Sequence, residues 1–231
     1  MLSQQTAHVR QVFINADFEA SLIASKLVSP QFSPQIIFIP TKEKKDFLLK
    51  AFPRITADYF VIIDSDVRWS VNQLASDLTL ARETNSDMVA SPFFIDTTSF
   101  GTALSKPVNM IEIENSIDLR KQLLLIVMGG HGTTLTRSAA LNPVDGDSVS
   151  KIALFGEHVT IQCKERVRHP LDFFHSGKIE ERRSALVNAK LWATTQPQSS
   201  KHMESMFDDV LAINIRFEDN VATQIFHAIQ D

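Results

Sequence analysis

The sequence predicts an α/β fold with a mostly parallel sheet flanked by helices. Short apolar runs alternate with amphipathic helical stretches, and the order strand, helix, strand repeats along the first 90 residues. The run at 59–63 is continuously apolar, which is typical of a parallel strand covered on both faces. Because parallel strands need helical crossovers, this order indicates a doubly wound sheet.

The N-terminal elements follow in order. Runs of β-branched or aromatic residues predict strands, and apolar residues at helical spacing predict the helices between them. The helix after Thr41, a good N-cap, places Phe47, Leu48 and Ala51 on one face. In the helix that begins near Ser70, an apolar face runs from Val71 to Ala81. The strands are predicted at 12–14, 36–39, 59–63 and 88–90, with helices at 19–27, 42–52 and 71–81.

The second half is less regular. Residues 123–128 predict a strand that enters the glycine cluster 129–132, and 137–141 predict a short helical turn. Residues 203–213 and 221–229 predict helices after a polar connection at 194–201. We expect one domain over 1–193 and a helical C-terminal extension over 194–231.

The composition is that of an ordinary globular protein. The chain has 231 residues, 44% hydrophobic and 22% charged, which excludes collagen-like and disordered classes. A net charge of −4 shows none of the excess of basic residues that is typical of nucleic-acid-binding proteins. Cys163 is alone, which fits a reducing compartment, and no run is long enough to cross a bilayer. We therefore expect a cytoplasmic chain without a transmembrane segment or signal peptide.

The main candidate site is Asp64-Ser65-Asp66, which follows the apolar strand at 59–63. In open α/β sheets ligands bind outside the carboxyl ends of the strands, so two carboxylates there face the expected crevice. Two nearby carboxylates repel each other unless a cation or a proton lies between them, and hard oxygen ligands suit Mg²⁺ or Mn²⁺. The alternative is that both are solvated turn residues that cap the next helix.

The stretch 42–74 resembles the nucleotide-sugar half of GT-A glycosyltransferases. It joins a lysine-rich helix, the strand ending in Asp64-Ser65-Asp66 and an amphipathic helix, and is most similar to the inverting family-2 group with its ceramide- and hopanoid-glucosyltransferase relatives. The resemblance, over about 36–185, implies a GT-A-like fold in which Asp64 and Asp66 hold Mg²⁺ or Mn²⁺ on the diphosphate of a nucleotide-sugar donor. It also implies transfer with inversion to an acceptor hydroxyl of a glycan or lipid.

Further residues take roles by the same resemblance. Gly130, His131 and Gly132 fall on the acceptor side, although a tight turn explains the cluster equally well. Glu157-His158 falls where the family has Glu-Asp, whose aspartate is the general base. Because the aspartate position here holds His158, either Glu157 or His158 would be the base, or catalysis is altered or lost.

Two weaker assignments complete the expected site. Arg182 and Arg183 are vaguely similar to the family's final arginine motif and would grip the diphosphate, or else lie on a solvated helix face. His175 is a candidate third metal ligand, since some GT-A enzymes use a histidine. The family's opening Pro-x-x-Asn is not evident, so the nucleobase pocket is either abbreviated or completed by a partner chain.

Two other functions fit parts of the sequence. A haloacid-dehalogenase-like phosphatase also has a strand followed by Asp-x-Asp, but its motif continues with Gly-Thr where this chain has Val67-Arg68. A degenerate GT-A-like domain that binds a nucleotide or partner without turnover would explain His158 and the short N-terminal region.

Overall fold

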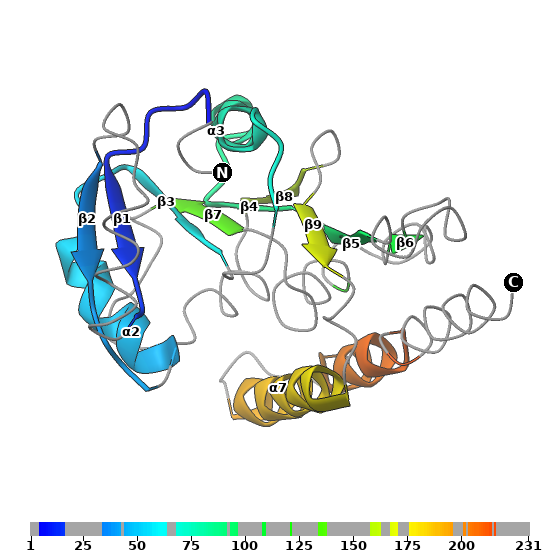
Figure 1. Cartoon of the computed structure of the whole chain (residues 1–231). Coiled ribbons are helices and arrows are strands. Elements are labelled where there is room, and N and C mark those ends of the chain that lie inside the picture. The colour runs from blue at the N-terminus through cyan, green and yellow to red at the C-terminus, as the bar shows by residue number, and fades with distance from the viewer. Residues whose placement is uncertain are drawn as a thin grey trace, which may run out of the picture. The chain divides into compact units, whose positions relative to one another are not determined.

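The computed structural model describes slightly more than half of the chain (Figure 1). The described residues are 5–16, 34–42, 44–63, 68–91, 93–96, 108–109, 121, 134–137, 158–162, 167–170, 176–195, 201, 203–213 and 215. The chain forms two compact units: unit 1 comprises 1–61, 70–89 and 135–160, and unit 2 comprises 62–69, 90–134 and 161–231. Within the described ranges, no helix is both long and apolar enough to cross a membrane.

Unit 1 begins with a parallel strand pair covered by a helix. Strands β1 (Gln11–Ile14) and β2 (Gln35–Phe38) pair from Gln11 opposite Gln35 to Ile14 opposite Phe38. Helix α2 (Lys44–Ala51) and the 3₁₀ turn η2 (Phe52–Arg54) follow. Their apolar residues form one cluster, which consists of Ile37, Ile39 and Ala51 with Phe13 and Phe47 packed against it. The two predicted strands and the helix after Thr41 are confirmed.

A four-stranded sheet has the order β3, β7, β4, β8, with β3 at Tyr59–Ile62, β7 at Thr134–Arg137, β4 at Met88–Ala90 and β8 at Val159–Ile161. It belongs to unit 1 except for one terminal residue of each strand, namely Ile62, Ala90, Thr134 and Ile161, which are assigned to unit 2. The predicted strands at 59–63 and 88–90 are confirmed. Arg137 ends β7, so the helical turn predicted to begin there is wrong at that residue.

Backbone hydrogen bonds at the strand ends show the strand directions. Asp87 N donates to His158 O at 2.7 Å and Gln162 N donates to Ala90 O at 2.9 Å, so β4 and β8 advance together and are parallel. Arg137 N donates to Asp87 O at 2.9 Å, which places the carboxyl end of β7 at the amino end of β4. Strand β7 is therefore antiparallel to β4.

The burial of the sheet differs from the prediction for β3. All four residues of β3 are only partly buried, and β3 is at one end of the described strand order. The three residues of β4, in contrast, are fully buried. The strand is thus only partly covered, although both faces make contacts: Tyr59 and Val61 pack against the buried Ala81 and Val89, and the ring of Phe60 lies 5.5 Å from that of Phe52.

Helix α3 (Gln73–Glu83) connects β3 to β4 and packs on the sheet through its apolar face. Ala81 and Val89 form its buried core, with Tyr59, Val61 and Leu78 packed against them. The prediction is wrong at the first turn: Val71 lies before the helix and is 50% exposed.

Unit 2 contains a three-stranded sheet and the C-terminal helices. Strand β5 (Phe93–Asp96) lies between β6 (Val108–Asn109), with which it is antiparallel, and β9 (Val167–Pro170), with which it is parallel. Helix α7 (Ser176–Thr194) and the helical residues 203–213 each bury one face. Their buried apolar residues are Leu186, Ala189, Ala193, Met206, Phe207, Val210 and Ile213.

An ion pair between Lys190 and Asp208 joins α7 to the second helical segment. The predicted helix at 203–213 is confirmed. The boundary at residue 193 stays a prediction, as do the elements at 19–27, 123–128 and 221–229, which lie outside the described residues.

Candidate functional site

Two edges of the four-stranded sheet carry polar side chains. The amino ends of β3, β4 and β8 lie in unit 1 together with the carboxyl end of β7, whereas the carboxyl-terminal residues of β3, β4 and β8 lie in unit 2. The carboxylates Asp64 and Asp66 follow β3 in the sequence. Ligands bind at the carboxyl edge in open α/β sheets, so we expect a ligand site at that edge and not at the amino edge.

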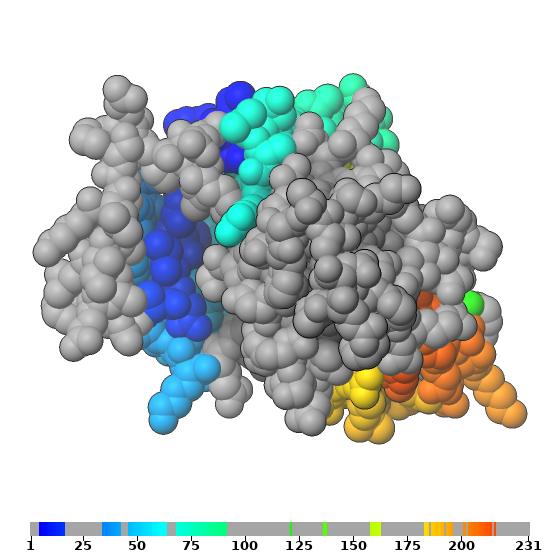
Figure 2. Space-filling view, turned by 45° about the vertical axis from the view of Figure 1, so that its right-hand side comes forward, coloured from blue at the N-terminus to red at the C-terminus, as the bar shows by residue number. Residues whose placement is uncertain are grey.

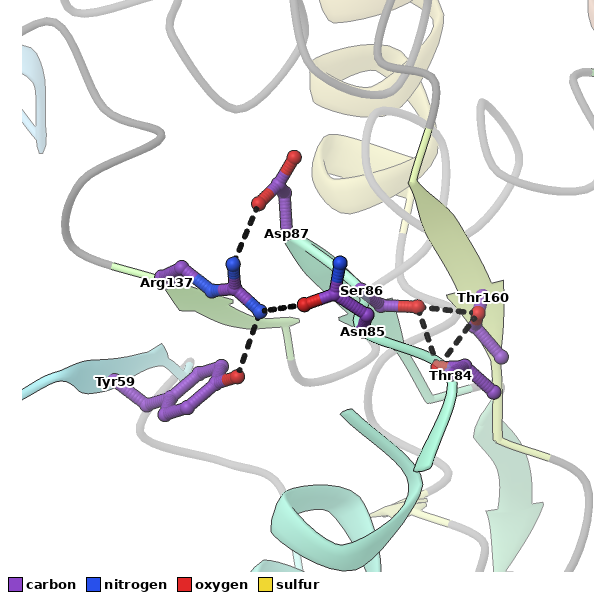
Figure 3. Close-up of polar contacts among 7 residues, drawn as sticks. All are labelled: Tyr59, Thr84, Asn85, Ser86, Asp87, Arg137 and Thr160. Carbon is purple, nitrogen blue, oxygen red and sulfur yellow. Dashed lines mark hydrogen bonds and ion pairs between the residues drawn. The ribbon is translucent and has the colours of Figure 1, made fainter. Parts of the chain in front are cut away.

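At the amino edge, Arg137 is the centre of a polar cluster (Figure 3). Its Nη2 donates to Asn85 Oδ1 at 2.9 Å and to the Tyr59 hydroxyl at 3.3 Å, while Nη1 lies 3.6 Å from Asp87 Oδ1. The guanidinium carbon also lies 5.7 Å from the centroid of the Tyr59 ring. One side chain therefore ties β7 to β3 and to the segment that enters β4.

The hydrogen bond to Tyr59 raises the pKa of Arg137 above its ordinary value, with a smaller contribution from the charge of Asp87 and against the opposing effect of partial burial. The group thus stays cationic over the whole physiological range. Its donors already meet three partners, and its side chain is 31% exposed. This arrangement connects strands, and we assign it a structural role.

The turn that ends α3 orients Asn85 for its contact with Arg137. Asn85 has a positive φ of 49°, Asn85 N donates to Arg82 O at 3.3 Å, and Ser86 N donates to Ala81 O at 2.8 Å. These two bonds form a Schellman motif, in which the residue after the C-cap adopts the left-handed conformation that asparagine tolerates. The motif directs the chain from α3 into β4.

Three hydroxyls lie beside this turn and link it to β8. Ser86 Oγ is 2.6 Å from Thr84 Oγ1 and 2.6 Å from Thr160 Oγ1, and Thr84 Oγ1 donates to Leu80 O at 2.7 Å (Figure 3). Ser86 is buried, and its hydroxyl is satisfied by these partners. The trio therefore completes the hydrogen bonding of a helix end rather than forming a reactive group.

At the carboxyl edge, two buried polar residues follow adjacent parallel strands. Ser91 comes directly after β4 and Gln162 directly after β8, and both are almost completely buried. Gln162 N donates to Ala90 O at 2.9 Å, so the two strand ends lie side by side. Both residues belong to unit 2, as do Ile62 and Ile63, which precede the carboxylate pair.

The sequence analysis missed Ser91 and Gln162. For Ser91 the available signal was a polar residue immediately after a short apolar run, the same pattern that identified Asp64, whereas Thr160 interrupts the apolar residues before Gln162.

Most predicted site residues lie outside the described residues. These are Asp64, Asp66, Gly130, His131, Gly132, Glu157 and His175. Arg182 lies in α7, although its side chain is not among those described, and Arg183 is partly buried on the same helix. Within the described ranges, no three His, Cys, Asp or Glu side chains are grouped so that they could hold a metal ion.

His158 is the predicted site residue with the most detailed environment. Its side chain is exposed, and its carbonyl oxygen accepts the amides of Asp87 at 2.7 Å and Met88 at 3.3 Å. The residue therefore lies directly before β8, at the amino edge of the sheet and in unit 1. Its role as the acceptor base stays a prediction.

The comparisons with known proteins identify the fold. No protein-family model matches the chain, and no curated protein matches its sequence. The structure is similar to that of S. aureus TarS 1–349 in complex with UDP-GlcNAc, with a TM-score of 0.61 and 10% identity over 94% of this chain and 67% of that one. Similarity extends to TarS 1–349 with UDP, at a TM-score of 0.55 and 9% identity over 93% of this chain and 64% of that one.

This chain spans about two thirds of the TarS 1–349 fragment and 39% of a longer TarS chain. At 10% identity the likeness shows the fold alone: a mixed α/β architecture of the GT-A type, as the sequence predicted. Placement within the ceramide and hopanoid glucosyltransferase group stays a prediction.

Proposed function

We propose that this chain is a GT-A-type glycosyltransferase that moves a sugar from a nucleoside-diphosphate donor to an acceptor hydroxyl group, with inversion. The observation that carries the proposal is the position of Asp64-Ser65-Asp66 in the chain, directly after Ile63 and the end of β3, in a fold similar to that of a protein solved with UDP-GlcNAc. The same edge of the sheet carries the carboxyl ends of the parallel strands β4 and β8, and ligands of open α/β sheets bind at that edge.

The proposed donor is a UDP-sugar. TarS has been solved with both UDP and UDP-GlcNAc, so these two ligands are the first to test here. In the proposal, Asp64 and Asp66 hold Mg²⁺ or Mn²⁺, with His175 as a third ligand, and Arg182 or Arg183 binds the diphosphate. The carboxylate oxygens are the hard donors that such ions prefer, and a bound ion neutralises charge on the leaving diphosphate.

On the acceptor side, the backbone around Gly130, His131 and Gly132 approaches the acceptor, a glycan or a lipid. Glu157 or His158 removes the proton from its hydroxyl group as the sugar is transferred. The attacking oxygen forms the new glycosidic bond while the bond to the diphosphate breaks, and the diphosphate leaves with the electron pair.

Ligand-dependent thermal stability tests the donor assignment. A UDP-sugar at 100 times its dissociation constant stabilises the native state by about 2.7 kcal/mol, so the melting temperature rises in the presence of Mn²⁺. Asp66→Ala is expected to remove the Mn²⁺-dependent part of this rise. Asp46→Ala, at an exposed carboxylate of α2, is the matched control and keeps it.

Release of the free nucleoside diphosphate then tests turnover. The proposal is wrong if no UDP-, GDP- or dTDP-sugar stabilises the wild-type chain, or if Asp66→Ala binds the donor with undiminished metal dependence. Donor binding without diphosphate release favours the second candidate, a GT-A-like binding domain without catalysis. The exposed His158 at the amino end of β8 is the observation that favours that candidate.

A further inference from the structure

A glutamine near the start of the chain is bonded to the segment that opens α3. Gln5 Nε2 donates to Ser70 O at 2.8 Å, and Leu74 N donates to Gln5 Oε1 at 3.1 Å. Next to it, Thr6 N donates to Val71 O at 3.1 Å. Figure 2 shows the N-terminal residues, in dark blue, lying against the turquoise surface of this segment.

These contacts replace a missing helix cap. The first amides of an α-helix have no partner within the helix, and a side chain at the N-cap usually accepts one of them. Asn72, the N-cap of α3, makes no such bond. The acceptor for Leu74 N is instead the Gln5 side chain, 69 residues away in the sequence.

Gln5 also holds one end of the connection that carries the predicted metal ligands. Residues 63–69 join β3 to Ser70, whose carbonyl oxygen accepts the Gln5 amide. The other end follows β3 in the sheet. Holding both ends of a short connection reduces the number of conformations that it can adopt. Less conformational entropy is then lost when a ligand binds to it.

We propose that Gln5 is a positioning residue for Asp64 and Asp66: by clamping Ser70 and capping α3, it preorganises the connection that binds the donor diphosphate and its metal ion. This role rests on the proposed function. It predicts an effect on donor affinity that exceeds the effect on overall stability.

A second glutamine of unit 1 provides a matched control. Gln11 Oε1 accepts Thr56 N at 2.9 Å, and Gln11 Nε2 donates to Arg54 O at 3.3 Å. Like Gln5, it bridges a backbone amide and a backbone carbonyl of a distant segment. That segment, however, precedes β3 and is not joined directly to the carboxylate pair.

The test compares Gln5→Leu, Gln5→Glu and Gln11→Leu. For each variant, calorimetry measures the dissociation constant of UDP-GlcNAc with Mn²⁺, and hydrogen exchange follows the amides of 64–74. Gln5→Leu loses both bonds, so we expect donor binding about five- to tenfold weaker and faster exchange at Leu74. Gln5→Glu keeps an acceptor for Leu74 N but not the bond to Ser70 O, so we expect about two- to threefold weaker binding.

Gln11→Leu is expected to lower the melting temperature by a few degrees, as Gln5→Leu does, while leaving donor affinity within about twofold. Equal donor affinity in Gln5→Leu and wild type, or equal weakening in Gln5→Leu and Gln11→Leu, overturns the positioning role alone. If Gln5→Leu does not fold, wild-type affinity in Gln5→Glu overturns it. A wild-type chain that binds no nucleotide sugar overturns both this role and the proposed function.

Discussion

The guanidinium carbon of Arg137 lies 5.7 Å from the centroid of the Tyr59 ring, and Nη2 of the same arginine donates to the Tyr59 hydroxyl at 3.3 Å. The two residues are 78 positions apart and belong to adjacent strands, β7 and β3. This pair holds β3, the end strand of the described order, against β7. Asp64 and Asp66 follow β3 in the sequence.

Replacing the guanidinium group of Arg137 is expected to destabilise the fold more than removing the hydroxyl group of Tyr59. Arg137→Met loses the contacts to Tyr59, Asn85 and Asp87, whereas Tyr59→Phe keeps the ring face. We expect melting temperatures lower by a few degrees for Arg137→Met and by less for Tyr59→Phe, measured by calorimetry. A larger decrease for Tyr59→Phe would contradict this order.

The effect of Arg137→Met is expected not to change between pH 6 and pH 9. The folded-state pKa of Arg137 is raised, chiefly by the hydrogen bond to Tyr59. A group with a raised pKa contributes its full stabilisation below the unfolded-state value and loses it only above, which for arginine is far beyond this window. Denaturant unfolding of both proteins across the window measures the difference, and a slope in that difference would argue against the assignment.

Asn85 separates the helix cap from the contact to Arg137. Asn85→Gly keeps the left-handed residue of the Schellman motif and loses only the acceptor for Arg137, whereas Asn85→Ala also carries the steric cost of a positive φ. We expect Asn85→Ala to be less stable than Asn85→Gly by about 1–2 kcal/mol in urea unfolding. Equal stability of the two variants would contradict the cap.

Ser86→Ala is expected to destabilise the protein by about 1 kcal/mol, because the buried hydroxyl bridges Thr84 and Thr160. Thr79→Ala is the control: Thr79 Oγ1 donates to Ala75 O on the exposed surface of α3, and alanine favours the helix. The control is expected to change stability by less than about 0.5 kcal/mol in the same urea experiment. A neutral Ser86→Ala would show that the trio adds nothing.

Single variants separate the two candidate bases, Glu157 and His158: when Glu157 is the base, His158→Ala leaves the rate of sugar transfer within about threefold of wild type. A general base contributes about 10²- to 10⁴-fold, so Glu157→Gln, which keeps the size of the side chain, is expected to lower kcat by at least about 10²-fold. Single-turnover transfer assays measure both variants. The opposite pattern would identify His158 as the base.

Local patterns in the sequence determined which N-terminal segments form strands and which form helices. The apolar runs that became β1, β2, β3 and β4 form strands because β-branched and aromatic residues suit an extended backbone, and α3 follows from helical spacing. The alternation of these elements was sufficient to predict an α/β fold, and the resemblance of 42–74 to GT-A glycosyltransferases predicted its type. It also showed that two carboxylates follow a strand end.

Only the tertiary structure decided how distant segments meet. Strand β7 lies between β3 and β4, although its Thr-Leu-Thr-Arg sequence has no strong apolar run. The Gln5 cap of α3, the Arg137 cluster and the adjacent positions of Ser91 and Gln162 likewise join residues from segments far apart in the chain. Such contacts leave no local periodicity, because hydrogen bonds and ring contacts depend on which strands become neighbours in the sheet.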